Sequence, residues 1–180
     1  MPGRKTYPPT LAGRLRRLLR NRLTDAADVR RAFPPEVLQR LGERVRASEQ
    51  RHTGQIRICI EAGLPWSYIR RDAPARQRAV TQFGKLRVWD TAHNNGVLIY
   101  LLLAEHAIEI VADRGIDTHV DAAEWQAMAR RMGQAFSEGR FEDGVTLALE
   151  EVSALLVAHF PASPGTHRHS NELPDTPVVI

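Results

Sequence analysis

Two apolar segments that lie close together in the chain constrain the fold most strongly. An Asn-Gly pair at 95–96 precedes a run at 97–103 that is apolar at every position, and a second mostly apolar run covers 107–112. A run without polar positions is typical of a strand buried on both faces of a sheet. Only three residues, 104–106, separate the two runs, which is short enough for an antiparallel connection. The sequence therefore predicts a buried β-hairpin.

The remaining pattern supplies one more strand and several helices. Residues 55–61 begin with alternating polar and apolar side chains and are rich in β-branched residues, which predicts a strand. Apolar residues at helical spacing predict helices over 35–51, 74–87, 121–138 and 145–159. Because a helix joins the first strand to the second, we expect these two strands to be parallel neighbours. The fold class is therefore α/β, a three-layer αβα sandwich with a small mixed β-sheet containing one antiparallel hairpin.

Composition divides the 180 residues into three parts. Residues 1–31 form a basic N-terminal arm with an amphipathic helix, and 32–161 form the αβα domain. Residues 162–180, rich in Pro, Ser, Gly and His, are expected to be a mobile C-terminal tail. The single cysteine, Cys59, excludes an internal disulfide bond, and its apolar surroundings in the sequence favour a buried, unreactive thiol.

The arm carries nine Lys and Arg residues against two Asp, and its helix places leucines on one face. Those leucines are Leu11, Leu15, Leu18 and Leu19. The candidate contact residues for a protein partner or an anionic membrane surface are Arg14, Arg16, Arg17, Arg20 and Arg22. The pattern suits a helix lying in a membrane interface, and it suits slightly better a helix that docks its leucines on the domain and turns its arginines to water. Nucleic acid is disfavoured as a partner, because no aromatic residue stands among the arginines.

Localisation follows from the apolar content. No stretch reaches the roughly 18 apolar residues of a membrane span, and no apolar segment follows the basic N-terminus as in a secretion signal. We therefore expect a cytoplasmic protein, with peripheral attachment to the inner membrane if the arm binds lipid.

Carboxylates give the best signal for a chemical site. Asp113 and Asp117 follow the second apolar run, and Asp90 and Asn95 stand just before the first, so the hairpin should bring all four to one edge of the sheet. Oxygen ligands of this kind suit Ca²⁺ or Mg²⁺, so these four residues are the candidate metal ligands. The next carboxylate, Asp121, fits better as the N-cap of the following helix. The chain has no glycine-rich phosphate loop, nucleophile elbow or zinc-protease motif.

Four short blocks resemble the TPM domain family. They are a glutamate followed by Thr-Gly and a strand at 48–57, Asn-Gly-Val-Leu-Ile at 95–99, Asp-Arg-Gly-Ile-Asp at 113–117, and Phe-Glu-Asp-Gly at 141–144. The segments 30–35 and 171–175 are similar to the bacterial branch of the family that lacks a signal peptide and a membrane span.

The resemblance implies an αβα sandwich, divalent-cation binding and, in some members, acid phosphatase activity. The chain departs from the family pattern at two positions: Asn94 stands for an aspartate, and Asp113 stands for a glycine. Two hypotheses follow. The first is an accessory role in cell-envelope or membrane-protein upkeep through protein or membrane contact. The alternative is a metal-dependent phosphatase at the acidic edge, where a bound cation would polarise a phosphoryl oxygen; it ranks second because no nucleophile is evident.

Overall fold

The computed structural model describes residues 10–162 and 171–180, and only the backbone of Asp117, Ala122, Gln126 and Ala129. Its elements in chain order are α1 (Leu11–Leu23), α2 (Ala26–Ala32), α3 (Pro35–Glu49), β1 (Gln55–Glu61), α4 (Trp66–Arg70), α5 (Ala75–Lys85), β2 (Gly96–Leu102), the 3₁₀ turn η1 (Leu103–Glu105), β3 (Ala107–Ala112), α6 (Arg114–Asp117), α7 (Ala122–Ser137), α8 (Phe141–His159) and β4 (Val178–Val179). None of the helices described here combines the length and the apolar composition needed to cross a bilayer.

The strands form one mixed sheet in the order β3-β2-β1-β4. β1 and β2 are parallel, with Ile58 beside Ile99, and β3 runs antiparallel to β2, with Ile110 on the other side of Ile99. Every residue of β2 is buried, which explains its uninterrupted apolar sequence. The predicted hairpin is confirmed.

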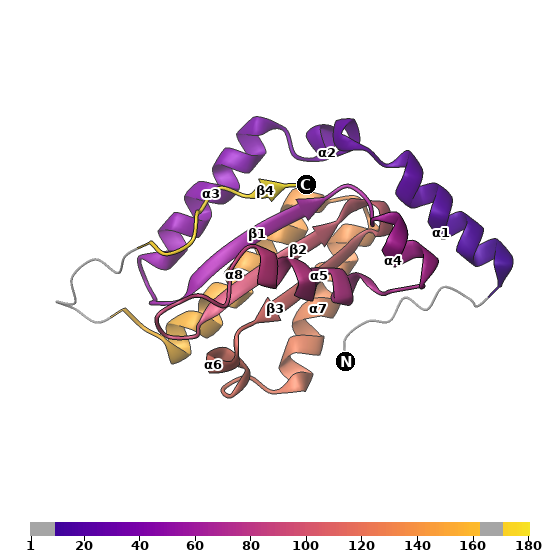
Figure 1. Ribbon diagram of the computed structural model, residues 1–180. Helices are drawn as coiled ribbons and strands as arrows, with labels where there is room; N and C mark the ends of the chain where they lie inside the picture. Colours follow the sequence, from indigo (N-terminus) through magenta and orange to yellow (C-terminus); the bar gives the residue numbers. More distant parts are fainter. Residues whose placement is uncertain (1–9, 163–170) are drawn as a thin grey trace.

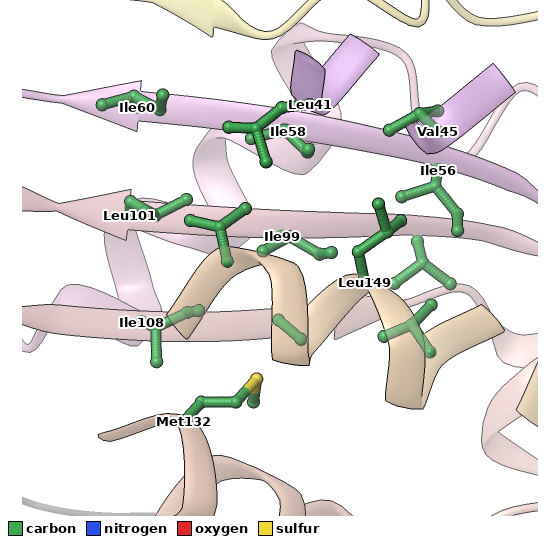
Figure 2. Packing of buried hydrophobic residues seen from close by; sticks show 14 of the residues in the cluster. Leu41, Val45, Ile56, Ile58, Ile60, Ile99, Leu101, Ile108, Met132 and Leu149 are labelled. Carbon is green, nitrogen blue, oxygen red and sulfur yellow. The ribbon is translucent and has the colours of Figure 1, made fainter. Parts of the chain in front are cut away.

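Helices cover both faces of the sheet (Figure 1). Alternate residues of β1 supply the two cores, because successive side chains of a strand point to opposite faces. Ile56, Ile58 and Ile60 pack with residues of α3, α7 and α8, whereas Cys59 packs on the α4 and α5 side. Figure 2 shows the first of these cores, including Leu41, Val45, Met132 and Leu149 from the helices. The three-layer αβα sandwich is confirmed.

Burial also settles the character of the cysteine. Cys59 is fully buried, and this burial raises the pKa of its thiol to about 12. The thiolate is the reactive form of cysteine, so the side chain acts as a small apolar group.

The C-terminal segment differs from the mobile tail expected over 162–180. Residues 171–180 run along α3 and β1, and β4 pairs parallel with β1, with Val178 beside Cys59. Leu173 is buried in the core on the α5 side, and Asp175 forms an ion pair with Arg46, with 2.9 Å between carboxylate and guanidinium. The sequence does not predict this packing, because a strand of two residues is too short to show an alternating pattern. The other residues of the expected tail, 163–170, lie outside the described part of the chain.

Because β3 runs antiparallel to β2, its carboxyl end lies at the end of the sheet where β1 and β2 begin. At this end, the backbone N–H of Asp113 donates to the carbonyl of Gly96 at 2.9 Å. At the other end, η1 follows β2, and the loop after β1 meets α1, where the N–H of Leu64 donates to Oδ1 of Asn21 at 2.7 Å. We call the first end the acidic rim.

Candidate functional site

Asp113 is the most unusual group at the acidic rim. It caps the short helix α6, and its Oδ1 accepts a hydrogen bond from the N–H of Arg114 at 2.7 Å. The residue is 9% exposed, and its Oδ2 is buried without a hydrogen-bond partner among the described residues. A buried acceptor without a partner is costly and rare in folded proteins. This oxygen therefore favours binding of a proton donor or a cation.

Asn95 precedes Gly96, whose carbonyl accepts from the N–H of Asp113, and is itself almost fully buried. Its backbone N–H donates to Oγ1 of Thr91 at 3.1 Å, and its Nδ2 donates to Oγ1 of Thr53 at 3.2 Å. The residue therefore joins the loop before β1 to the loop before β2. Of the predicted metal ligands, the structure brings Asn95 and Asp113 to the same edge, as expected.

A glycine sets the distance between the two loops of the rim. The N–H of Gly115 donates to the carbonyl of Asn94 at 3.0 Å, and a Cβ on Gly115 would collide with that same oxygen. Asn94 adopts a left-handed conformation with φ of 51°, which asparagine tolerates better than most residues. The turn at 94–96 and the turn that contains Gly115 therefore pack directly against each other, and this packing requires glycine at 115.

The other two predicted ligands are placed differently. Asp90 is exposed in a turn in which its N–H donates to the carbonyl of Arg87 at 2.9 Å. Asp117 ends α6, and its side chain lies outside the described atoms. Within the described part of the chain, no three acidic, histidine or cysteine side chains are grouped closely enough to hold a metal ion. The four-residue cation site therefore stays a prediction. Asp121 caps α7, with its Oδ1 accepting from the N–H of Glu124 at 2.8 Å, as the helix-cap interpretation requires.

A serine and a histidine that sequence analysis did not single out as a pair lie behind the rim. Oγ of Ser48 is 2.8 Å from Nε2 of His52, whose Nδ1 is 3.1 Å from the carbonyl of Gly54. The carbonyl requires Nδ1 to carry the proton, so the serine hydroxyl donates to Nε2. Both side chains are buried, and burial lowers the pKa of His52 to about 4. A substrate has no access to this pair, so its role is to fasten the end of α3 to the loop before β1.

The glutamate of the first family-like block lies beside this pair. Oε1 of Glu49 accepts a hydrogen bond from the N–H of Ile56 at 2.8 Å, at the start of β1. Desolvation by burial raises the pKa of Glu49 to about 7. Glu49 is therefore a group of the rim region that changes charge near neutral pH.

On the α1 side, the structure differs from the prediction of how α1 is attached to the domain. Arg17, in the middle of α1, is 3% exposed and anchors the helix to the domain. Its Nε lies 2.7 Å from Oε1 of Glu105, its Nη1 lies 2.8 Å from Oδ1 of Asp72, and its Nη2 donates to the carbonyl of Ala73 at 2.6 Å. One turn further along, Nδ2 of Asn21 donates to the same Glu105 oxygen at 3.1 Å. The helix therefore docks through polar side chains.

This docking turns four leucines outward, whereas Leu18 of the predicted leucine face is half-buried. The exposed fractions of Leu11, Leu15, Leu19 and Leu23 are 86%, 56%, 49% and 75%, and we call these four residues the leucine row. The expectation that the leucines pack on the domain while all five arginines face water is wrong, because Arg17 is the buried residue. The physical reason is that Glu105 is itself buried and requires a cationic partner, which a leucine face cannot supply.

The remaining arginines of α1 surround the leucine row. Arg14, Arg16 and Arg22 are exposed and Arg20 is half-buried, and α1 contains no Asp or Glu. Figure 1 places α1 at the outer side of the molecule, away from the central sheet. The helix thus presents an apolar and basic surface to the surroundings.

Comparison with known proteins identifies the family of this chain. The chain is similar to the NMR structure of the BA42 protein from the psychrophilic bacterium Bizionia argentinensis, with a TM-score of 0.70 and 24% sequence identity over 82% of this chain and 94% of that one. At this identity the likeness shows the fold. No functionally curated protein matches the chain. The family model described as the TPM domain matches residues 26–155, from the start of α2 into α8, so α1 and β4 lie outside the matched segment. The chain belongs to the TPM domain family.

Proposed function

We propose that this TPM domain protein attaches peripherally to an anionic membrane surface through α1, and that it serves there in an accessory role in the upkeep of the cell envelope or its membrane proteins. The observation that carries this proposal is the leucine row, which lies outward on a helix that Arg17 fixes to the domain.

The energetics favour an apolar environment for the row. Burying a leucine side chain stabilises a complex by roughly 1.5–3 kcal/mol relative to leaving it in water. A helix with leucines on one side and arginines beside them suits the plane between lipid headgroups and acyl chains, with each arginine near anionic headgroups adding about 1 kcal/mol. The absence of Asp and Glu from α1 selects an anionic surface. Pairing of two copies through this row would bring their arginines together, which disfavours self-association.

Vesicle flotation tests the proposal. We expect the full chain to float with vesicles containing phosphatidylglycerol, less so as the salt concentration rises, and not with purely zwitterionic vesicles. The double substitution Leu15→Ser, Leu19→Ser should abolish flotation without lowering the free energy of unfolding, because both side chains are exposed. Val80→Ser, which removes an exposed apolar side chain from α5, is the matched control and should float like the unaltered chain. Failure of the unaltered chain to float, or equal flotation of the double variant, would overturn the proposal.

A second candidate function is a divalent-metal-dependent phosphatase at the acidic rim. The unpartnered Oδ2 of Asp113 is the observation that favours it. Asp113 and Asn95, with Asp90 and Asp117, would hold Ca²⁺ or Mg²⁺, and the bound cation would polarise a phosphoryl oxygen. The N–H of Arg114 holds the other carboxylate oxygen of Asp113, and the N–H of Gly115 joins the two rim loops through the carbonyl of Asn94.

Thermal melts with and without millimolar Ca²⁺ or Mg²⁺ test this second candidate. A cation that binds the folded state alone stabilises it by about 2.7 kcal/mol at a hundred times its dissociation constant. We expect the midpoint of the unaltered chain to rise, that of Asp113→Asn to stay fixed, and that of Asp121→Asn to rise normally, because asparagine caps α7 as well as aspartate does. Metal-dependent hydrolysis of p-nitrophenyl phosphate, lost in Asp113→Asn, completes the test. An unchanged midpoint for the unaltered chain would count against the site.

A further inference from the structure

A cavity of about 760 Å³ lies on the α1 side of the molecule, at the opposite end of the sheet from the acidic rim. The end of α1, the helix α2, the η1 turn and the start of α8 line it, and it is open to solvent. Its volume is within the range of 300–1,000 Å³ typical of ligand pockets. The η1 turn follows the carboxyl end of β2, and in open α/β sheets ligands bind outside the carboxyl ends of parallel strands.

The floor of the cavity is apolar and firmly packed. Leu103 and Ala104 of η1 are buried beneath it. The ring of Phe141 lines it and packs edge to face against two rings, those of His106 and Phe136, at centroid distances of 5.3 and 5.4 Å. Such a floor suits an apolar portion of a ligand.

The charged side chains that line the cavity balance, with three carboxylates and three arginines, but among the described residues they leave one arginine without an ion pair. The lining carboxylates are already paired: Asp28 with Arg31 at 2.8 Å, Asp143 with Arg140 at 3.1 Å, and Glu142 with Arg40 at 2.9 Å. Arg20 also lines the cavity and takes part in none of the ion pairs formed by the described residues. No side chain caps the start of α8, and Glu142 and Asp143 in its first turn offset the positive potential of its free N–H groups.

The cavity is also continuous with the membrane-binding surface proposed above. Leu23, the last member of the leucine row, lines the cavity together with Arg20. A molecule lying along the leucine row can therefore reach an apolar floor and the guanidinium of Arg20, which forms no ion pair with the described residues, without crossing the protein surface elsewhere.

We propose that this cavity binds the headgroup of an anionic phospholipid, with the phosphate at Arg20 and the adjoining glycerol and acyl carbons over Leu103 and Phe141. This inference rests on the proposed membrane function, since the membrane would supply the ligand. The shared chemistry of phosphate binding also allows a soluble phosphate as the source, so the experiment includes both.

The experiment measures binding of monomeric dihexanoyl phosphatidylglycerol, a short-chain lipid used below its micelle concentration, by NMR titration of the full chain. We expect saturable shifts at residues lining the cavity. Ala32→Phe, which places a ring in the cavity from α2, should weaken binding at least tenfold, and Arg20→Gln should weaken it several-fold. Arg20→Gln keeps the test informative if the larger side chain of Ala32→Phe disturbs folding.

The membrane variant separates the two proposals. Leu15→Ser, Leu19→Ser should lose vesicle flotation yet keep its affinity for the short-chain lipid, because neither leucine lines the cavity. Failure of the unaltered chain to bind the short-chain lipid, or unchanged binding by both cavity variants, would overturn the lipid site while leaving the flotation result intact. Inorganic phosphate binding as tightly as the lipid would also overturn it, in favour of a soluble phosphate ligand.

Discussion

Arg17 and Glu105 form an ion pair of 2.7 Å in which both side chains are buried, with exposed fractions of 3% and 7%. The pair joins α1, which lies outside the segment matched by the TPM domain, to the turn that follows the central strand β2. It makes α1 part of the folded body and fixes the direction in which the leucine row points.

Replacing Arg17 by methionine should therefore destabilise the protein strongly. The substitution leaves the Glu105 carboxylate buried without its cation, and breaking such a pair costs about 3–5 kcal/mol. Urea denaturation is the measurement, with Arg16→Met, at an exposed position of the same helix, as the control. The double variant Arg17→Met, Glu105→Gln should recover part of the loss. Equal stability of the Arg17→Met and Arg16→Met variants would contradict the anchoring role.

Gly115 should tolerate no side chain. Alanine at this position would press on the Asn94 carbonyl, and we expect a loss of about 1–3 kcal/mol, as for other overpacked sites. Gly133, inside α7, has open space where a Cβ would stand, so Gly133→Ala should stabilise the protein by roughly 0.5–1 kcal/mol through better helix propensity. Thermal melts of the two variants test the contrast, and a neutral Gly115→Ala would show that the rim turns do not pack directly against each other.

The C-terminal segment should contribute measurably to stability. Leu173 is buried in the core on the α5 side, so Leu173→Ala should cost about 2–5 kcal/mol. Val179 lies in the same segment and is 41% exposed, so Val179→Ala should change the free energy of unfolding much less, by about 0.5 kcal/mol. Denaturant curves of both variants are the check; equal, small effects would mean that the segment is not held as described.

His52 should make stability fall in acid. Its pKa in the fold, about 4, is below its ordinary value of 6.5, so folding favours the neutral imidazole. The stabilisation is complete above pH 6.5 and is lost as the pH falls through 4. Each pKa unit corresponds to 1.36 kcal/mol, so the residue should account for a loss of about 2 kcal/mol between pH 7 and pH 5. In His52→Gln, the free energy of unfolding lost between pH 7 and pH 5 should be smaller by that amount. An equal loss in the variant and the unaltered chain would contradict the buried neutral state of His52.

Glu49 should act in the opposite direction. Its pKa in the fold, about 7, is above its ordinary value of 4.5, so its contribution is complete below pH 4.5 and is lost as the pH rises through 7. Glutamine keeps an oxygen for the N–H of Ile56 and carries no charge. Glu49→Gln should therefore exceed the unaltered chain in stability by up to about 3 kcal/mol at pH 8, with the advantage vanishing near pH 4. Urea denaturation at the two pH values decides the matter.

The central part of the fold was predictable because its residues carry a strong local pattern. A strand buried on both faces, such as β2, needs an apolar residue at every position, and a strand such as β1 shows its two faces by alternation. β4 lacks both signals, since it is two residues long and is held by the register of β1. Its existence depends on tertiary contacts that no short stretch of sequence contains.

The candidate sites were predictable to different degrees for the same reason. Asn95 and Asp113 flank the hairpin, so their approach followed from its topology, whereas the Ser48–His52 pair depends on how α3 ends. The orientation of α1 could not be predicted because Arg17 binds Asp72 and Glu105, which are far from it in the chain. A leucine stripe shows that a helix is amphipathic but not which of its sides is attached.

The position of β4 has a consequence for the order of folding. Arg57 of β1 donates to the carbonyl of Thr176 at 2.6 Å across a separation of 119 residues, so this contact closes a very long loop. The entropy of closing such a loop is lost before the contact is made, and pairings of this kind form late and slowly. During that interval β1 is an open sheet edge with unpaired N–H and C=O groups, the kind of edge at which chains associate wrongly. Yield on refolding should therefore depend more steeply on protein concentration when the segment 171–180 is removed than when it is present.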